Sequence, residues 1–194
     1  MMSIPDSKSL LRQRAQKWLI SQKPEVLAKN SSKICDKIRE TEEYHQSKTI
    51  LLYSPIKYEP DVLPLFTESI KLKKRVCLPR YNSLSATYEF ADILFGREIK
   101  MRKGQYGILE PCPENSRILL KSLDFCVVPG LMFGCDGTRL GRGKGHYDRI
   151  LDAFSGFKIG VCHQGQIMST VPVNQFDVPV DIICTELNVF RKSG

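Results

Sequence analysis

The middle of the chain carries the stretch Asp124-Phe125-Cys126-Val127-Val128-Pro129-Gly130. Its apolar residues are nearly continuous, without the alternation of polar and apolar residues that a strand with one solvated face shows. The stretch therefore predicts a strand that ends at Pro129-Gly130. A run of this kind is typical of a mainly parallel sheet that helices cover on both faces.

Helices and strands are predicted to alternate on both sides of this stretch. Apolar residues at helical spacing predict two amphipathic helices, one after Ser7 and one from Pro24 to about Tyr44, and a third over residues 62–70. Short β-rich runs predict strands over residues 49–53, 75–78 (ended by Pro79), 86–90 (a weaker one), 157–162 and 181–185. We therefore predict an α/β fold with a mainly parallel sheet.

Length and composition favour a single domain over residues 1–194. The chain has 194 residues, 42 % of them hydrophobic, and single domains commonly reach ~200 residues. The longest apolar runs fall short of the roughly 18 residues that a membrane-spanning helix needs. The N-terminal residues also lack the apolar stretch of a secretory signal. We expect a cytoplasmic protein without membrane contact.

The cysteines and the net charge narrow the possible partners. Seven cysteines without a Cys-x-x-Cys pair argue against a disulfide framework and against structural zinc. The formal net charge of +8 admits nucleic acid, a membrane surface, or a phosphorylated or carboxylated small molecule. Much of the positive charge is dispersed along the predicted helices, but one cluster lies in a glycine-rich segment. Its members are Arg139, Arg142, Lys144 and Arg149.

This glycine-rich segment, residues 129–149, is long for a loop in a small α/β domain, which favours a role in ligand binding. Glycines 141, 143 and 145 remove side chains from alternate positions, so that backbone N–H groups can converge on an anion. A predicted helix follows, and its N-terminal end would add positive potential. The cations that can donate charge-assisted hydrogen bonds to phosphate are Arg139, Arg142 and Lys144.

Two well-known phosphate-binding motifs do not match this segment. A Walker A loop would need a glycine where Thr138 stands and a serine or threonine where Gly145 stands. The dinucleotide fingerprint fails because the glycines are spaced by two residues and His146 follows. Two alternatives stay open at this point. One is a flexible loop with solvated arginines, and the other is an RNA-binding arginine-glycine segment, although such segments are usually repeated.

The string Gly137-Thr138-Arg139-Leu140-Gly141-Arg142-Gly143-Lys144-Gly145-His146-Tyr147-Asp148, preceded by Val128-Pro129-Gly130, resembles the signature of the 5-formyltetrahydrofolate cyclo-ligase family. Further pieces occur in the family's order: Lys8 to Arg12, Tyr53-Ser54 with Glu59, Pro79-Arg80, Gly107 to Pro111, and Val171-Pro172 leading to Asp177 and Val180-Asp181. The resemblance runs from about Lys8 to Thr185. It implies a fold shared with sugar-phosphate isomerases and CoA transferases.

The resemblance also implies a reaction. ATP, with Mg²⁺ as cofactor, would phosphorylate the formyl oxygen of 5-formyltetrahydrofolate. Ring closure onto the neighbouring nitrogen would then expel phosphate and leave 5,10-methenyltetrahydrofolate and ADP. Such chemistry needs two ligands held in line and neutralised charge rather than a protein nucleophile. The implied partners are ATP and a folate with or without a polyglutamate tail; a monomer is expected and no nucleic acid.

The family pattern assigns roles to individual residues. ATP would contact Lys8, Arg12, Arg139, Leu140, Gly141, Arg142, Gly143, Lys144, Gly145, His146 and Tyr147. The catalytic residues among them would be Arg142, Lys144 and Tyr147. The folate would contact Ser54, Glu59, Tyr106, His146 and Tyr147, with Tyr106 placed to stack on the pterin ring. Asp148 and Asp177 would hold Mg²⁺, since this hard cation prefers carboxylates and substrate oxygens.

Two positions depart from the family pattern. Many relatives carry Tyr-Tyr-Asp where this chain has His146-Tyr147-Asp148, so a titratable imidazole replaces a tyrosine. His163 also stands where relatives often have an aromatic residue, and we expect it to lie in the core or to line a pocket. Two other functions stay open: an isomerase or CoA-transferase-like activity on the shared fold, and a basic RNA-binding module.

Overall fold

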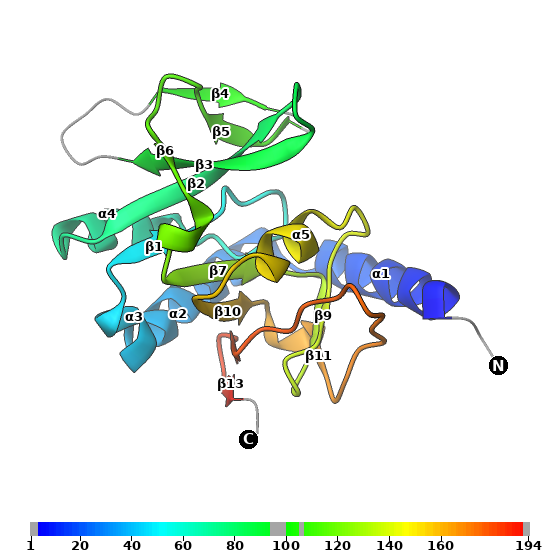
Figure 1. Ribbon diagram of the computed structural model, residues 1–194. Coiled ribbons are helices and arrows are strands. Elements are labelled where there is room, and N and C mark those ends of the chain that lie inside the picture. Colours follow the sequence, from blue (N-terminus) through cyan, green and yellow to red (C-terminus); the bar gives the residue numbers. More distant parts are fainter. Residues whose placement is uncertain (1–3, 94–99, 105–106, 192–194) are drawn as a thin grey trace.

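The computed structural model describes residues 4–93, 100–104 and 107–191. An eight-stranded sheet with the order β13-β12-β10-β7-β1-β2-β3-β6 forms its centre (Figure 1). The strands are β1 Thr49–Leu51, β2 Arg75–Asn82, β3 Thr87–Ile93, β6 Arg117–Ile118, β7 Phe125–Pro129, β10 Phe157–Val161, β12 Ile182–Cys184 and β13 Val189–Arg191. The run from β12 to β2 is parallel, whereas β13, β3 and β6 are antiparallel to their neighbours. The predicted mainly parallel sheet is confirmed.

Both faces of the central strands are buried, as the apolar run of β7 predicts. Phe125 and Val127 belong to one buried cluster, and Cys126 and Val128 to another on the opposite face. Helices α2 and α4 contribute side chains to the first cluster, and α5 contributes to the second. The helices are α1 Ile4–Ser21, α2 Pro24–Arg39, α3 Glu42–Gln46, α4 Leu63–Lys71 and α5 His146–Asp152.

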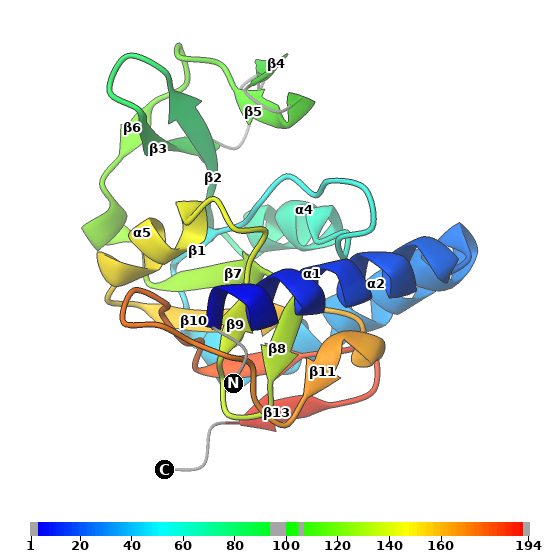
Figure 2. The ribbon, with the colours of Figure 1, turned by 90° about the vertical axis from the view of Figure 1, so that its right-hand side faces the viewer.

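Helix α1 covers a second, smaller sheet instead of the large one (Figure 2). That sheet has the order β11-β8-β9, with β8 at Met132–Gly134, β9 at Arg139–Leu140 and β11 at Ile167–Met168. Ala15 and Leu19 of α1 pack against Leu131 and Met132. The segment over residues 129–149, which we predicted to be a long loop before a helix, is therefore not a continuous loop, because Met132–Gly134 and Arg139–Leu140 form paired strands that α1 covers.

A small lobe rises above the large sheet, at the top of Figure 1. It contains the outer part of β2, strand β3, and a two-stranded sheet of β4 (Met101–Lys103) and β5 (Leu109–Pro111). The prediction that Pro79 ends its strand was wrong. β1 pairs with β2 only as far as Cys77, so β2 has a free side at Pro79, where a proline is tolerated.

The predicted helix from residue 24 to about 44 is divided in two. Helix α2 ends at Arg39, and α3 begins after Thr41, whose side-chain oxygen accepts a hydrogen bond from the Tyr44 N–H at 3.3 Å. Threonine is a preferred residue at a helix N-terminus, and here it starts a new helix instead of continuing the old one. The prediction of one helix over this range was wrong at the break, and α1 begins at Ile4 instead of after Ser7.

Two further expectations concern the cysteines and the membrane. All seven cysteines are free thiols, and five of them are buried, which agrees with the argument from sequence against a disulfide framework. Within residues 4–93, 100–104 and 107–191, no helix has both the length and the hydropathy to cross a bilayer.

Candidate active site

A cavity of about 590 Å³ lies between α1, the glycine-rich loop, α5 and the turn at residues 174–177. We call it the first cavity. Its lining residues are Ile4, Lys8, Arg12, Leu140, Gly141, Gly143, Gly145, Asp148, Arg149, Asp152, Asn174, Gln175, Phe176 and Asp177. Both residues expected to bind Mg²⁺ and six of the eleven expected to bind ATP thus line one space, although they come from distant parts of the chain. The other five, Arg139, Arg142, Lys144, His146 and Tyr147, line a second cavity.

Helix α1 brings two of the expected cations to this cavity. Lys8 is buried and forms an ion pair with Asp177, a residue that lies 169 positions later in the sequence. One turn further along α1, the Arg12 Nε donates a hydrogen bond to the Gly141 carbonyl at 2.9 Å. The two side chains lie on one face of the helix because they are four residues apart. Helix α1 is therefore tied both to the glycine-rich loop and to the 174–177 turn.

Arg139, in β9, contacts other residues of the site. Its guanidinium is buried, forms an ion pair with Asp148 at 2.5 Å, and donates to the Pro129 carbonyl at 3.3 Å. It also lies over the ring of Tyr147, 5.8 Å from the ring centre. Arg139 is consequently a fixed positive charge that orients two residues expected to act in the site.

The backbone of the glycine-rich loop adopts left-handed conformations at two of its glycines. Gly143 and Gly145 have φ values of 94° and 64°, in the left-handed region that side chains other than glycine rarely adopt. A Cβ added at Gly143 would lie 3.2 Å from the Arg12 guanidinium carbon. Gly145 also directly precedes α5, whose first turn contains Asp148. The loop can therefore approach a ligand with backbone alone.

A second cavity, of about 300 Å³, lies between the lobe and α5. Its lining residues are Tyr53, Ser54, Ile56, Glu59, Pro79, Tyr88, Ile108, Glu110, Pro129, Gly130, Arg139, Gly141, Arg142, Gly143, Lys144, Gly145, His146, Tyr147, Asp148 and Ile150. Apolar and aromatic side chains alternate with polar and charged ones in this lining, and such a combination of apolar surface and placed polar groups suits a site that binds an organic molecule. Every described residue expected to contact the folate is among them, whereas Tyr106 lies outside the described residues.

Glu59 is the acidic side chain that the sequence singled out for this second cavity. One carboxylate oxygen accepts from the Arg142 Nε at 3.2 Å, and the other accepts from the Ile56 N–H at 3.2 Å. Burial raises the pKa of Glu59, and the neighbouring Arg142 opposes that rise. Glu59 therefore combines a hydrogen-bonded orientation with a position inside a largely apolar pocket.

His146, Tyr88 and Tyr81 form an aromatic group at the second cavity. The His146 ring meets the Tyr88 ring edge-on, with ring centres 5.2 Å apart, and Tyr81 meets Tyr88 in the same way at 5.4 Å. Arg149 Nη2 lies 3.0 Å from the His146 Nδ1. Burial lowers the pKa of His146, and Arg149 lowers it further. The imidazole that replaces a tyrosine is thus an aromatic wall residue whose neutral form is favoured by burial and by the neighbouring Arg149.

Sequence reasoning missed Glu110, a second carboxylate in this cavity. Glu110 is buried, and one of its oxygens accepts from the Tyr81 N–H at 3.2 Å. Burial raises its pKa. The signal was available, because Glu110 lies within the segment Gly107 to Pro111 that resembles the family, but nothing in the segment itself distinguishes a pocket carboxylate from a surface one.

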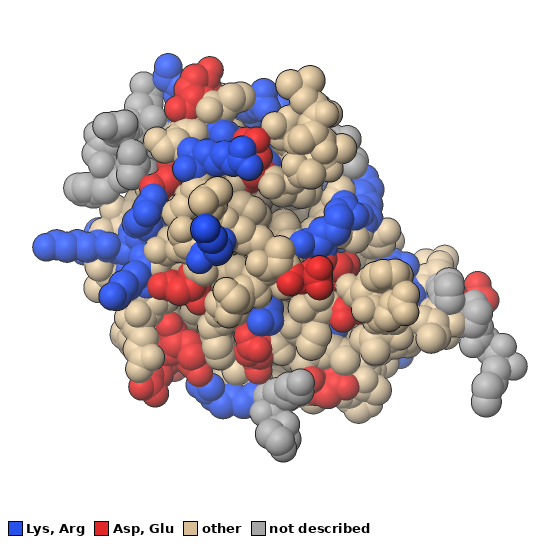
Figure 3. Space-filling model, in the orientation of Figure 1, with Lys and Arg blue, Asp and Glu red and all other residues tan. Residues whose placement is uncertain are grey.

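The two cavities share a wall. Gly141, Gly143, Gly145 and Asp148 line both of them, so the glycine-rich loop is the boundary between a charged space and a largely apolar one. On the surface outside, lysines and arginines are interspersed with acidic residues instead of forming one continuous basic patch on the face in Figure 3. The cations of the predicted cluster, Arg139, Arg142, Lys144 and Arg149, line the two cavities instead.

Comparison with known proteins identifies the family. A sequence model of the 5-formyltetrahydrofolate cyclo-ligase family matches residues 4–186. The chain belongs to this family. Its relatives include a probable 5-formyltetrahydrofolate cyclo-ligase of Caenorhabditis elegans, 26 % identical with 96 % of each chain covered, and the enzyme of Haemophilus influenzae, 32 % identical with 71 % of this chain and 75 % of the relative covered.

Solved structures agree with the cyclo-ligase assignment. A 5,10-methenyltetrahydrofolate synthetase of Aquifex aeolicus superposes with a TM-score of 0.85 at 35 % identity, covering 96 % of this chain and 93 % of that one. The family's reaction converts 5-formyltetrahydrofolate to 5,10-methenyltetrahydrofolate. Membership of this ligase family therefore argues against the alternatives of an isomerase, a CoA-transferase-like enzyme or an RNA-binding module.

Proposed function

We propose that this cyclo-ligase uses ATP to phosphorylate the formyl oxygen of 5-formyltetrahydrofolate and then closes the ring. One observation carries the proposal: the glycine-rich loop separates two cavities and lines both. The first cavity has the charged groups that a polyphosphate requires, and the second has the apolar walls and carboxylates that suit a pterin. Ligands in the two cavities would meet across Gly141, Gly143 and Gly145.

The proposed reaction has two steps. The formyl oxygen attacks the γ-phosphorus of ATP, so that a new oxygen–phosphorus bond forms while the bond to ADP breaks. The neighbouring nitrogen, N10, then attacks the formyl carbon; N10 loses its proton, and the carbon–oxygen bond breaks as phosphate leaves. Neither step needs a bond to the protein, but both need alignment and neutralised charge.

The cations expected to bind phosphate lie in two different cavities, one on the nucleotide side and one on the folate side of the transferred phosphoryl group. Lys8 and Arg12 would bind the nucleotide phosphates from the first cavity, and Arg139, which lines the second cavity, would support them through its ion pair with Asp148. Arg142 and Lys144 line the second cavity, so they would approach the transferring group from the folate side. Charge-assisted hydrogen bonds to phosphate oxygens are short and strong, and they stabilise the charge that moves during transfer.

Tyr147 is proposed to assist as a neutral hydrogen-bond donor. It lines the second cavity beside Arg139, and burial raises its pKa well above the ordinary value. The phenol therefore keeps its proton at neutral pH. His146 would pack against the pterin ring at the same wall, and Leu140 would contact the nucleotide from the first cavity.

The chemistry of Asp148 and Asp177 fits a magnesium ion. Both line the first cavity, and their ion pairs use Oδ1 of Asp148 and Oδ2 of Asp177, which leaves a second oxygen on each for a metal. Among the described residues no group of three or more His, Cys, Asp or Glu could hold a metal by itself. The remaining ligands would be phosphate oxygens and water, as is usual for Mg²⁺. When bound, the ion would neutralise phosphate charge.

The folate would lie with its ring in the second cavity and its tail in a third. Ser54 and Glu59 line the second cavity and would contact the ring. The third cavity, of about 350 Å³, shares Arg142 with the second and adds Lys57. We propose that the carboxylates of the folate tail, including a polyglutamate tail, leave along this cationic route.

An absorbance assay tests the proposed function directly. Purified protein with 5-formyltetrahydrofolate, ATP and Mg²⁺ should form the absorbing methenyl product, with equal amounts of ADP and phosphate released. Omission of ATP, or addition of a chelator in excess over Mg²⁺, should abolish product formation. Turnover without ATP would contradict the phosphorylation step. Cell fractionation and size-exclusion chromatography would test the further proposal of a cytoplasmic monomer.

A further inference from the structure

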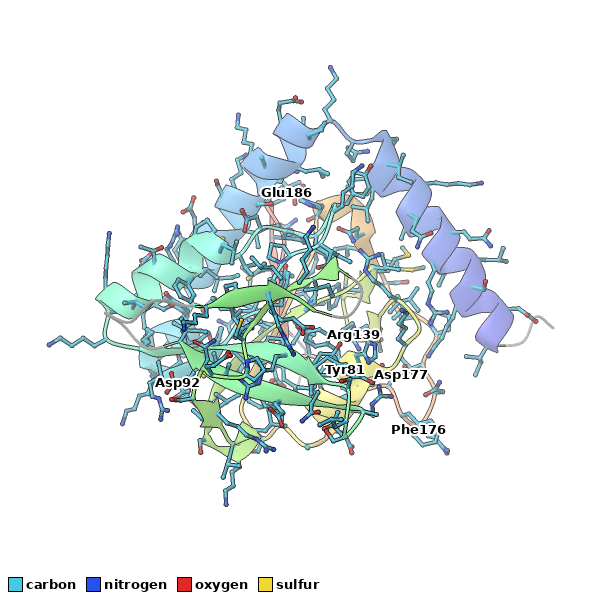
Figure 4. All side chains as sticks on the ribbon, turned by 90° about the horizontal axis from the view of Figure 1, so that it is seen from above. Tyr81, Asp92, Arg139, Phe176, Asp177 and Glu186 are labelled. Carbon is cyan, nitrogen blue, oxygen red and sulfur yellow. The ribbon has the colours of Figure 1, made fainter. Side chains whose placement is uncertain are left out.

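The turn at residues 174–177 presents a large aromatic side chain to the first cavity. Phe176 is 72 % exposed, although it is among the residues that line this cavity. In Figure 4 it lies at the periphery of the molecule, with Asp177 next to it and Arg139 nearer the centre. Phe176 is therefore at the outer end of the cavity, beyond the ion pair of Lys8 and Asp177.

Hydrogen bonds hold the Phe176 backbone in place. The Asn174 Oδ1 accepts from the Phe176 N–H at 2.9 Å, and the Asp177 carboxylate accepts from the Asn174 N–H at 2.6 Å. The Asp177 side chain also pairs with Lys8, which anchors the turn to α1. The aromatic ring thus extends from a cross-linked turn, and little conformational freedom would be lost when a ligand packs on it.

The first cavity has a second exposed apolar side chain, Ile4. Ile4 is 48 % exposed, lines the same cavity, and precedes Lys8 by four residues on α1, so both project from one face of the helix. The cavity therefore has two chemically different ends. Cations and glycines form the inner end, and Phe176 with Ile4 forms an apolar outer end, flanked by the amides of Asn174 and Gln175.

We infer that Phe176, with Ile4, is the binding surface for the purine base of the nucleotide. A nucleoside triphosphate has the same two ends as the cavity: a polyanion that suits Lys8 and Arg12, and a flat aromatic base that stacks on a phenylalanine ring. The inference rests on the proposed function, because it takes ATP to be the occupant of the first cavity. It adds a residue that determines nucleotide affinity without touching the reacting phosphate.

Calorimetry with two ligands tests this inference. Mg²⁺-ATP and Mg²⁺-tripolyphosphate share the phosphates, and only ATP carries a base. We expect Phe176→Ala to weaken ATP binding roughly 5- to 150-fold, the range for loss of one base–aromatic stack, and to leave tripolyphosphate binding unchanged. Phe176→Trp should retain ATP affinity, and Phe176→Leu should fall between the two. Leu187→Ala is the matched control, since Leu187 is also exposed but lies outside the cavities.

Each of the other possible results of this calorimetry would contradict one specific part of the argument. Unchanged ATP affinity in Phe176→Ala would refute the stacking role; if Gly143→Val still weakened both ligands, the proposed function would stand. Equal weakening of ATP and tripolyphosphate would show that the ring only shapes the turn, which also refutes the inference. A wild-type protein that binds neither ligand would contradict the assignment of the first cavity to the nucleotide.

Discussion

The two cavities on either side of the glycine-rich loop differ in how they treat charge. In the first, the acidic side chains Asp148 and Asp177 are each paired with a cation. In the second, Glu110 is buried and accepts a hydrogen bond from a backbone N–H, whereas half-buried Glu59 pairs with Arg142; burial raises the pKa of both. The difference teaches that carboxylates on the two sides of one short loop can differ in how strongly burial opposes their ionisation. Substitutions should therefore affect one ligand and not the other.

The largest effect is expected at the shared wall. Gly143→Val should reduce turnover by roughly 10²-fold or more, because the side chain would occupy the phosphate path. The left-handed backbone at this position should add a loss of stability of about 1–2 kcal/mol, which leaves the protein folded. Steady-state kinetics and thermal unfolding on the same preparation measure both. Gly107→Val is the control for backbone strain, since Gly107 also has a positive φ but has open space around it. Normal ATP affinity in folded Gly143→Val would disprove the phosphate-binding role of the loop.

On the apolar side, Glu59→Gln should weaken folate binding and spare ATP. The expected loss is roughly 1.5–3 kcal/mol, the value for a hydrogen bond to a charged group. Affinities for both ligands are to be measured on one variant, with exposed Glu114→Gln as the control. Equal losses for folate and ATP would mean general disruption. An unchanged folate affinity would remove Glu59 from the substrate site.

On the charged side, Asp148→Asn and Asp177→Asn should each raise the Mg²⁺ concentration needed for half-maximal rate. We expect a change of roughly tenfold, or about 1.4 kcal/mol, because each variant removes a negative oxygen ligand from a hard cation. Magnesium titrations of the rate provide the measurement. Asp152→Asn is the matched control, since Asp152 lines the same cavity. The metal assignment fails if both variants keep the wild-type magnesium dependence.

The smallest effect is expected outside both cavities, at His163. Its side chain is buried, and burial lowers its pKa below the ordinary 6.5. Below pH 6.5 the unfolded chain binds a proton that the folded chain does not, so the free energy of unfolding should fall as the pH is lowered. The slope contributed by this group is at most about 1.4 kcal/mol per pH unit.

Urea unfolding between pH 7.5 and pH 5 measures this slope. His163→Leu should lower stability at neutral pH by an amount set by packing, and it should flatten the slope relative to the wild type. His45→Leu is the control, because His45 lies on the surface side of α3. An identical slope in wild type and His163→Leu would show that His163 is not responsible.

The large sheet could be predicted because its signal is local. Strand β7 is apolar on both faces and β10 has apolar residues at alternate positions, and these patterns are present in the sequence whatever surrounds them. The lobe and the small sheet could not be predicted in the same way. Strands β8 and β9 have three and two residues, and they are stabilised by α1 packing over them instead of by their own sequence.

The sequence predicted which residues belong to the site, but it did not predict which of them form ion pairs with one another. The family resemblance singled out Lys8, Arg139, Asp148 and Asp177, and the structure brings all four to the first cavity or its wall. That Lys8 pairs with Asp177 depends on a contact between residues 169 positions apart, for which one sequence contains no signal. Phe176 was missed because an aromatic residue in a turn is indistinguishable in sequence from one that folds into the core.

Strand β2 has a mechanical consequence for the second cavity. Its first three residues pair with β1 in the large sheet, and its remaining residues pair only with β3 in the lobe, with Pro79 at the cavity where this change occurs. The roof of the cavity is therefore joined to the large sheet by a two-stranded ribbon, since β3 pairs with β2 from Val76 to Asn82. To widen the pocket, the protein must bend this ribbon near Pro79, so the stiffness of two hydrogen-bonded strands sets how far the roof can move.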